Sequence, residues 1–455
     1  MLNRKIDVAI IGAGTAGITA FHAIKAADKK VVLIDRGPLG TTCARVGCMP
    51  SKAALHAGMR WETAKQLPDG AVLFPQGRQA LWKHARETRD MLANGAAERT
   101  RNAAKDSLIL AEASFIEPGV LQVGSERVEA DAIIVATGSS PVVPKALEGV
   151  ATRILTTDTL FDLESLPKRL GILGMGAVGL ELGLALARLD VEVIGADQRR
   201  TIGGVQDPMV RERAICAFIS ELPMWLGDSV EINPAGDGVL MRTSEHSAVV
   251  DRLLVVTGRA PNTAALNLSA AGISLDDQGR PSIDPVTMQA SDVPIFFAGD
   301  VQPDRALMHE AADEGLMAAQ AALSYLRDEQ RPSTSRRVPM SILFTDPDVC
   351  TVGASYDAAM QQGAIIGLAE GSGNGRSKIL GAQDNLLRVY AEPDTGILLG
   401  ASMLLTQGEH IAHLLAWAIQ AKQTIDDLLT MPYYHPSIEE MLQSALKSAS
   451  QEIVA

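Results

Sequence analysis

Short apolar runs alternate along this chain with longer stretches in which apolar positions recur every three to four residues. Apolar runs at 6–11 and 31–34 flank a stretch of helical pattern that ends near Ala27. The same order of strand, helix and strand returns between the apolar runs at 170–173 and 191–194. Strands that alternate with helices in this way are typical of parallel sheets in α/β proteins. The pattern therefore predicts two α/β domains built on one plan.

Three further apolar strands each lead into a turn of small residues. The first two follow the two α/β units and are predicted to close their sheets. The third brings a carboxylate to a glycine turn. These strands and their turns are 132–136 with Thr137 and Gly138, 253–257 with Gly258, and 294–298 with Gly299 and Asp300.

The last part of the chain follows a charged, proline-containing segment at 327–337, which we interpret as a linker. Before it, residues 56–105 are polar with helical character and are assigned to the first domain, and 140–144 marks a crossover between domains. After the linker, the pattern predicts strands at 341–344, 386–391 and 397–403, and helices at 408–421 and 438–448.

Glycines stand at the end of the first strand in the pattern Gly-x-Gly-x-x-Gly, at Gly12, Gly14 and Gly17. Such glycines permit a tight turn and let a pyrophosphate approach the N-terminus of the following helix. Asp35 ends the second strand, where its carboxylate can accept hydrogen bonds from a ribose. Two such patterns imply two dinucleotides, one held tightly and one exchanging. The second pattern is Gly174, Gly176 and Gly179.

Two cysteines, Cys43 and Cys48, follow the first glycine pattern by some thirty residues. Thiols joined by so short a segment can close a disulfide, and an accessible disulfide is a reversible store of two electrons. The alternatives are a static bridge, which is uncommon in cytosolic proteins, or two free core cysteines, which would not need the surrounding glycine, proline and lysine. The context favours redox activity. Cys216 and Cys350 lie in apolar contexts and are predicted to be buried.

The composition narrows the class of protein. The 455 residues are 47% hydrophobic and include 40 glycines, as in a compact α/β enzyme of two to four domains. A net charge of −13 and 4% aromatic residues argue against nucleic acid as a partner. No apolar run approaches membrane-spanning length, and the first strand leaves no room for a signal peptide. We therefore expect a cytoplasmic enzyme without membrane association, and no residue cluster has metal-ligand spacing.

The Cys-x4-Cys loop, the paired glycine patterns and Ala298-Gly299-Asp300 together resemble the flavin-dependent pyridine nucleotide-disulfide oxidoreductases, which include dihydrolipoamide dehydrogenase, glutathione reductase and mercuric reductase. The resemblance covers essentially the whole chain. It implies an α/β fold with two Rossmann-like dinucleotide-binding domains plus an α+β C-terminal dimerisation domain, and the cofactors FAD and NAD(H) or NADP(H). The implied domains are FAD-binding over 1–145, NAD(P)-binding over 146–262, a central segment of the FAD-binding domain over 263–330, and dimerisation over 336–455.

The same resemblance implies where the cofactors bind. The first glycine pattern with Asp35 would hold the ADP half of FAD, and Asp300 its ribityl or phosphate portion. Met308 and His309 belong to a segment that covers the flavin through backbone groups in the family. The further implied cofactor-binding residues are Thr42, Lys52, Thr137, Gly138, Gly174, Gly176, Gly179 and Gly258.

Roles in catalysis are implied for six residues. Cys48 would be the thiolate that faces the isoalloxazine ring, and Cys43 the interchange thiol that attacks substrate sulfur. Lys52 would lie near the flavin, where a cation stabilises reduced flavin and thiolate, and its expected partner is Glu181. The segment from His435 to Glu440 resembles the family's His-Pro-(Thr/Ser)-x-x-Glu element. His435 would be the base, oriented by Glu440 and supplied by the neighbouring subunit of a homodimer.

Two departures from the family pattern bear on specificity. NAD-selective relatives carry an acid after the second strand of the nicotinamide domain, a position that the sequence assigns to Gly195. Arg199 or Arg200 could bind a 2′-phosphate there. However, NADP-selective relatives place arginine where this chain has Ala196. The choice between NAD and NADP therefore stays open, with a slight preference for NAD. The second departure is Tyr433-Tyr434 before the histidine, where lipoamide dehydrogenases commonly carry a further histidine.

Three functions follow from these features. The leading hypothesis is a homodimeric FAD enzyme of dihydrolipoamide dehydrogenase type that interconverts a small-molecule dithiol and its disulfide with NAD(P)+. The second is an NADPH-dependent reductase of another low-molecular-weight disulfide. The third is an assembly role, as a flavoprotein subunit of a 2-oxo acid dehydrogenase complex. The C-terminus lacks the additional thiol pair of mercuric reductases and large thioredoxin reductases.

Overall fold

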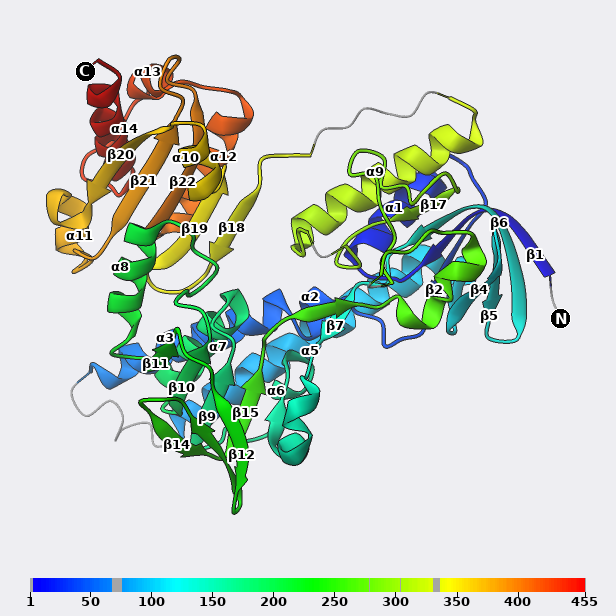
Figure 1. Cartoon of the computed structure of the whole chain (residues 1–455), viewed down its shortest axis with the longest axis horizontal. Helices are drawn as coiled ribbons and strands as arrows, with labels where there is room; N and C mark the ends of the chain where they lie inside the picture. Colours follow the sequence, from blue (N-terminus) through cyan, green and yellow to red (C-terminus); the bar gives the residue numbers. More distant parts are fainter. Residues whose placement is uncertain (1–2, 68–75, 278, 303, 330–335, 455) are drawn as a thin grey trace. The chain divides into compact units, whose positions relative to one another are not determined.

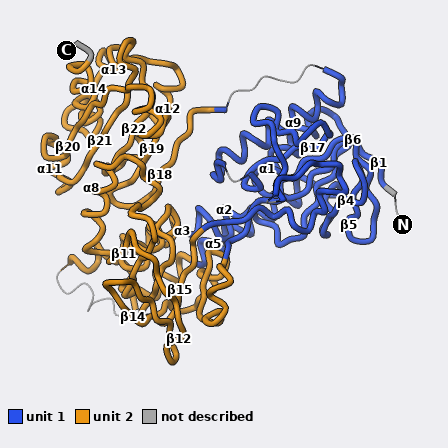
Figure 2. The backbone as a smooth tube through the Cα atoms, in the orientation of Figure 1, with its two compact units in different colours: residues 1–50, 86–142, 258–336 blue, residues 51–85, 143–257, 337–455 orange. Residues whose placement is uncertain are grey.

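The computed structural model describes residues 3–67, 76–277, 279–302, 304–329 and 336–454 (Figure 1). The chain divides into two compact units, each assembled from three separate segments (Figure 2). Unit 1 comprises 1–50, 86–142 and 258–336, and unit 2 comprises 51–85, 143–257 and 337–455.

Unit 1 is built on a seven-stranded sheet in the order β3-β2-β1-β6-β5-β4, with β17 beside β6. Strands β3, β2, β1, β6 and β17 pair in parallel, whereas β5 pairs antiparallel with β6 and β4 pairs antiparallel with β5. The predicted parallel sheet is therefore present. The strands are β1 (Asn3–Ile11), β2 (Val31–Asp35), β3 (Leu108–Leu110), β4 (Ala113–Glu117), β5 (Val120–Val123), β6 (Glu126–Val135) and β17 (Ile295–Phe297).

Helices α1 (Thr15–Ala26) and α9 (Met308–Leu326) pack against one another over the sheet of unit 1 (Figure 1). Alternate residues of β1 enter two different cores, because side chains of a strand point to opposite faces. Val8 and Ile10 join the core with these helices, and Ala9 and Ile11 join the core on the other face. Short strands β7 (Ser139–Pro141) and β16 (Arg259–Pro261) pair beside the sheet, and α2 spans Thr42–Arg45.

Unit 2 contains a second sheet with parallel strands, in the order β11-β10-β9-β15-β8. An antiparallel three-stranded sheet, β12-β13-β14, accompanies it. The strands are β8 (Ile154–Leu155), β9 (Arg169–Leu173), β10 (Glu192–Asp197), β11 (Met224–Leu226), β12 (Glu231–Ala235), β13 (Gly238–Arg242), β14 (Ser247–Val250) and β15 (Arg252–Val255). The helices are α3 (Cys48–Lys65), α5 (Gly77–Ala104), α6 (Thr157–Leu160), α7 (Ala177–Arg188) and α8 (Pro208–Phe218), of which α3 and α5 continue into unit 1.

The C-terminal part of unit 2 is an antiparallel sheet in the order β18-β19-β22-β21-β20, covered by helices. Its core includes Leu415 of α12 and Leu442 of α14. The strands are β18 (Met340–Leu343), β19 (Asp348–Gly353), β20 (Ile365–Glu370), β21 (Leu386–Ala391) and β22 (Leu398–Leu405). The helices are α10 (Tyr356–Gln361), α11 (Gly375–Ile379), α12 (Gly408–Gln420), α13 (Ile425–Leu429) and α14 (Glu439–Val454).

Residues 51–85 belong to unit 2, whereas the polar, helical pattern of 56–105 predicts helices of the first domain. Two buried tryptophans explain the difference. The ring of Trp82 stacks on Phe161 with centroids 5.4 Å apart. The Trp61 Nε1–H donates to the Asp190 carboxylate over 2.6 Å.

Two smaller expectations have mixed outcomes. Cys350 is buried as predicted, but Cys216 is exposed. The buried apolar side chains of α8 lie on one face of the helix, and Cys216 lies on the opposite face. The linker predicted at 327–337 lies partly outside the described residues. None of the described helices is long and apolar enough to cross a membrane.

Candidate active site

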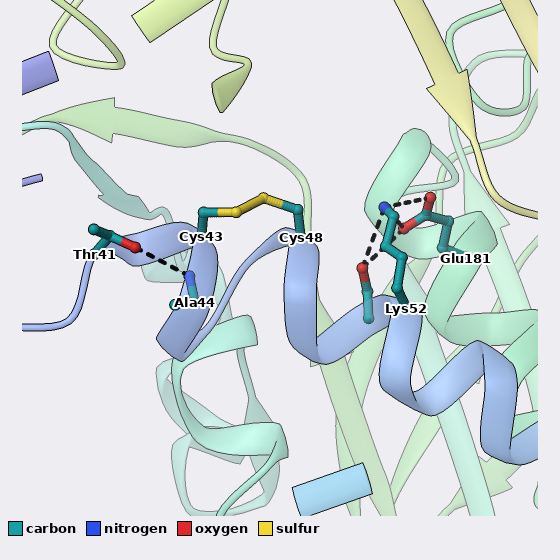
Figure 3. The surroundings of a disulfide bond; sticks show 7 residues. Thr41, Cys43, Ala44, Cys48, Lys52 and Glu181 are labelled. Carbon is teal, nitrogen blue, oxygen red and sulfur yellow. Dashed lines mark hydrogen bonds and ion pairs between the residues drawn. A yellow bond between two sulfur atoms is a disulfide. The ribbon is translucent and has the colours of Figure 1, made fainter. Parts of the chain in front are cut away.

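Cys43 and Cys48 form a disulfide, with Cα atoms 4.9 Å apart (Figure 3). Cys43 lies in α2, next to the exposed Thr42, and Cys48 is the first residue of α3. Both cysteines are half-buried, so the bridge is accessible. The N-terminal end of a long helix favours an anion, and reduction of the disulfide would therefore release Cys48 as a stabilised thiolate.

Lys52 and Glu181 form the predicted ion pair (Figure 3). The Lys52 Nζ lies 2.8 Å from both carboxylate oxygens of Glu181. The Ser51 hydroxyl donates to the same carboxylate over 3.0 Å. A third donor is the backbone N–H of Phe344, at 3.1 Å, and the Phe344 ring lies under the ammonium with its centroid at 4.9 Å.

Burial differs sharply across this pair. The Glu181 side chain is 6% exposed, and the Lys52 side chain is 31% exposed. A buried carboxylate needs several donors to offset its lost hydration, and Glu181 has them in Ser51, Lys52 and Phe344. Lys52 is thereby held in one place, one helical turn after Cys48 on α3.

The first glycine pattern forms a cradle at the N-terminus of α1. Gly12 has a φ of +109°, and a Cβ at Gly17 would lie 1.8 Å from the Gly12 carbonyl oxygen. By contrast, no atom lies within 4 Å of a Cβ placed at Gly14, which opens the cradle for a ligand. The Asp35 carboxylate accepts from the N–H groups of Ala13 and Gly37, at 2.7 and 2.6 Å.

The second glycine pattern repeats this arrangement in unit 2. Gly174 has a φ of +105°, a Cβ at Gly179 would lie 2.0 Å from the Gly174 carbonyl oxygen, and Gly176 faces open space. Helix α7 follows without a side-chain cap at Gly176, as α1 does at Gly14, so the first N–H groups of each helix are available to a phosphate.

The acid of the second pattern is Asp197, and the assignment of its position to Gly195 was wrong. Asp197 ends β10 and accepts from the Met175 N–H over 3.0 Å, as Asp35 accepts from Ala13. A Cβ at Gly195 would lie 2.4 Å from the Met175 sulfur, so that glycine is a packing position. The second Asp197 oxygen accepts from the Arg199 N–H at 2.9 Å. Both patterns therefore carry an acid.

Asp300 is brought next to Arg259 and Ser139 within unit 1. The Arg259 guanidinium donates to the hydroxyl and the carbonyl of Ser139 over 2.8 and 2.6 Å. Burial raises the pKa of the Asp300 carboxyl, while Arg259 and Ser139 act in the opposite direction. Gly299, with a φ of +79°, forms the turn that presents Asp300.

The remaining predicted cofactor residues lie at turns and at a helix end in unit 1. Gly138 and Gly258 have φ values of +65° and +155°, and no atom lies within 4 Å of a Cβ at either. The Thr137 hydroxyl is buried without a hydrogen-bond partner among the described residues, so it is free for a ligand. Met308 and His309 are exposed in the first turn of α9, whose N-cap makes no side-chain bond. Open glycines, an unpaired buried hydroxyl and uncapped helix ends fit a bound dinucleotide.

His435 and Glu440 form the predicted couple at the start of α14. The His435 Nδ1 lies 3.0 and 3.2 Å from the two Glu440 oxygens, and one of these oxygens also accepts from the Ser437 N–H at 3.0 Å. The hydrogen bonds from His435 and Ser437 lower the pKa of Glu440. Because an ionised carboxylate accepts from Nδ1–H, the neutral imidazole has its free lone pair on Nε2, where it can act as a base. The His435 side chain is 77% exposed.

The two tyrosines before His435 differ in their surroundings. The Tyr433 hydroxyl donates to the Leu428 carbonyl over 3.2 Å, and burial raises its pKa. Tyr434 is 85% exposed. Only Tyr434 therefore offers its ring to a molecule that approaches His435.

Two protein families match this chain. Residues 6–324 match the family described as pyridine nucleotide-disulphide oxidoreductase, and residues 339–446 match its dimerisation domain. A dihydrolipoyl dehydrogenase of Halobacterium salinarum is 30% identical over 97% of this chain and 96% of its own length. A mercuric reductase of Staphylococcus aureus is 29% identical over 93% of this chain and 78% of its own length.

Solved structures share the fold. The flavoprotein disulfide reductase RclA from Escherichia coli, described as HOCl-induced and solved as a Cu(II) complex, superposes with a TM-score of 0.83 at 22% identity, covering 98% of this chain and 99% of its own. LpdA from Mycobacterium tuberculosis gives the same TM-score, identity and coverage.

Proposed function

Because the chain belongs to the pyridine nucleotide-disulphide oxidoreductase family, whose members depend on FAD and use NAD(P)(H), we propose that it is a homodimeric oxidoreductase of the dihydrolipoyl dehydrogenase type. It would oxidise a small dithiol to its disulfide and reduce NAD+. The observation that carries the proposal is the accessible Cys43–Cys48 disulfide, whose second cysteine begins a long helix. We assign FAD to 1–145 with 263–330, the nicotinamide cofactor to 146–262, and dimer contacts to 336–455.

The chain's own groups can carry out the sulfur chemistry. Nε2 of His435, which the neighbouring subunit supplies, takes the proton of one substrate thiol, and the resulting thiolate attacks Cys43. The Cys43–Cys48 bond breaks, and Cys48 leaves as a thiolate. The second substrate sulfur loses its proton, attacks the first at the mixed disulfide and expels the Cys43 sulfur, which takes up that proton, so that the substrate leaves as a disulfide with two fewer electrons. FAD, held by the cofactor-binding residues named above, would supply the redox chemistry that carries those two electrons from the enzyme dithiol to NAD+.

The Lys52–Glu181 pair supports this chemistry from one turn along α3. Its cation favours negative charge nearby, both on a thiolate and on a reduced flavin. Glu181 holds the ammonium in place by accepting two hydrogen bonds from it at 2.8 Å.

We further propose NAD as the nicotinamide form, because of Asp197. A carboxylate at the end of the second strand repels a 2′-phosphate and suits the two hydroxyls of an unmodified ribose. Asp197 holds the position in unit 2 that Asp35 holds in unit 1. Asp197→Ser should therefore raise kcat/KM with NADP+ relative to NAD+, and an unchanged ratio would refute this assignment.

A second candidate, reduction of another low-molecular-weight disulfide by NADPH, is favoured by Tyr434. Tyr434 is exposed and directly precedes His435 in the sequence, which departs there from lipoamide dehydrogenases. The relatives of similar sequence include a mercuric reductase, so they do not all act on lipoamide. If the chain has the first function, it could act as a subunit of a 2-oxo acid dehydrogenase complex. Copurification with an acyltransferase core checks this.

Steady-state rates discriminate between these functions. Dihydrolipoamide oxidation is measured with NAD+ and NADP+, and the reverse reaction with NADH and NADPH against lipoamide and oxidised glutathione. We expect the highest rate with dihydrolipoamide and NAD+, its loss in Cys43→Ser, and its retention in Cys216→Ser, which removes an exposed thiol outside the site. Full activity in Cys43→Ser would refute the mechanism, and faster reduction of glutathione by NADPH would favour the second candidate.

A further inference from the structure

The turn that presents Asp300 is enclosed by two helices of unit 1. A Cβ at Gly299 would lie 3.0 Å from the Ala16 Cβ of α1 and 3.3 Å from the Ala311 Cβ of α9. Glu314, also on α9, contacts this turn, and its Oε2 accepts from the Gly299 N–H over 2.7 Å. Glu314 is 2% exposed. A buried, charged carboxylate thus accepts a hydrogen bond from one backbone N–H of the turn, although a neutral acceptor would satisfy the same donor.

The counter-charge of Glu314 comes from a residue distant in sequence. The Arg336 Nη2 lies 2.6 Å from Glu314 Oε1, and its Nη1 lies 3.6 Å from the Asp304 carboxylate. Arg336 precedes β18, and its side chain is 15% exposed. The carboxylate therefore connects the Gly299 turn with the segment that leads to the C-terminal sheet.

The charged groups that face Glu314 act in both directions. Burial raises its pKa to about 7, the Gly299 N–H and Arg336 lower it, and Glu310 and Asp304 raise it further. Glu310 is itself paired with Arg305 at 3.2 Å. The ionised form of Glu314 thus depends on the Gly299 N–H first and on Arg336 next.

We propose that the Glu314–Arg336 ion pair is a positioning device for the flavin site, which fixes the Gly299 turn and through it Asp300 for the binding of FAD. The inference rests on the proposed function, since it assumes that Asp300 contacts this cofactor. Protonation of Glu314 releases Arg336 and loosens the turn. The affinity for FAD then falls as the pH drops through neutrality, without any change in the residues that touch the cofactor.

The test is a titration of apoprotein with FAD, followed by flavin fluorescence at several pH values. For wild type, Kd should rise by up to about tenfold between pH 8 and pH 6, because the ionised fraction of a group that titrates near 7 falls by that factor. Glu314→Gln should bind more weakly at pH 8 and show a flatter profile. Arg336→Gln should move the midpoint of the profile to higher pH, and Arg336→Lys, which keeps the cation, should restore most of the affinity.

The matched control is Arg327→Gln, which removes an arginine at the end of α9 that is 46% exposed and paired with Glu329 at 3.7 Å. It should keep the wild-type Kd at each pH. The inference is overturned if Glu314→Gln and Arg336→Gln bind FAD like wild type at every pH, or if they lower only the thermal stability of the apoprotein and keep the wild-type pH profile. Failure of wild-type apoprotein to bind FAD at all would instead refute the proposed function.

Discussion

Replacement of Glu181 by alanine removes the acceptor of three donors at once. The Ser51 hydroxyl and the Phe344 N–H lose a partner in a buried place, and the Lys52 ammonium loses its ion pair. The perturbation lies within unit 2, between α3, α7 and the segment after β18. It therefore reports on how strongly this carboxylate holds these elements together.

The magnitude follows from the burial of each donor. A hydrogen bond to a charged group contributes about 1.5 kcal/mol or more, so the Ser51 and Phe344 donors together contribute about 3 kcal/mol. The ion pair contributes about 1 kcal/mol after a discount for solvent, because Lys52 is 31% exposed. The sum of about 4 kcal/mol corresponds to a fall in Tm of about 8 °C, at about 2 °C for each kcal/mol in a large domain. Glu181→Gln keeps an acceptor oxygen and should lose about half as much.

Thermal unfolding of the apoprotein, followed by circular dichroism, measures the shift. Glu192→Gln is the control, since it removes another glutamate of unit 2 whose side chain is 63% exposed and 3.9 Å from Lys168. Its Tm should stay within about 1 °C of wild type. A Glu181→Ala protein that melts with the control would refute the argument that buried donors at this carboxylate stabilise unit 2.

Three other predictions test the remaining features. Mixing Cys43→Ser with His435→Gln subunits should restore about a quarter of wild-type activity through hybrid dimers, and no recovery after exchange would contradict a site shared between subunits. Gly17→Ala should prevent a folded glycine turn and FAD retention, because the added methyl group meets the Gly12 carbonyl. Gly14→Ala should fold and lose only affinity for FAD, because its methyl group meets open space. Equal circular dichroism and flavin content of the two variants would be evidence against this. Burial raises the pKa of Asp348 to about 7, so its contribution to stability is full below its ordinary pKa and is lost as the pH rises through 7. Asp348→Asn should therefore flatten the fall in Tm between about pH 5 and pH 8, and an unchanged slope would show that another group causes it.

Residues that act within one local motif were the ones that the sequence could predict. The glycine patterns, the disulfide and the His435–Glu440 couple each depend on neighbours a few residues away. The Lys52–Glu181 pair joins distant segments, and it was predicted through the family resemblance, since neither residue has a local signal for the other. Glu314 was missed because its partner Arg336 lies beyond the end of α9 and its burial depends on the packing of α1.

Two errors had signals in the sequence. Asp197 follows Gly174 at the same separation, 23 residues, as Asp35 follows Gly12, and this count places the acid correctly. The helical period in α8 likewise places Cys216 away from its apolar face. The membership of residues 51–85 in unit 2 had no such signal, because an apolar stripe does not specify which of two cores will receive it.

The hydrogen bonds from Ala13 to Asp35 and from Met175 to Asp197 hold each glycine turn rigidly against the end of the neighbouring strand. A loop that a ligand must immobilise subtracts about 1 kcal/mol or more from the affinity for each residue that it orders. The protein's own groups make these bonds in both turns. If unit 2 takes the exchanging nicotinamide nucleotide, as we propose, that nucleotide would enter and leave in every turnover without the delay of a loop that folds and unfolds around it.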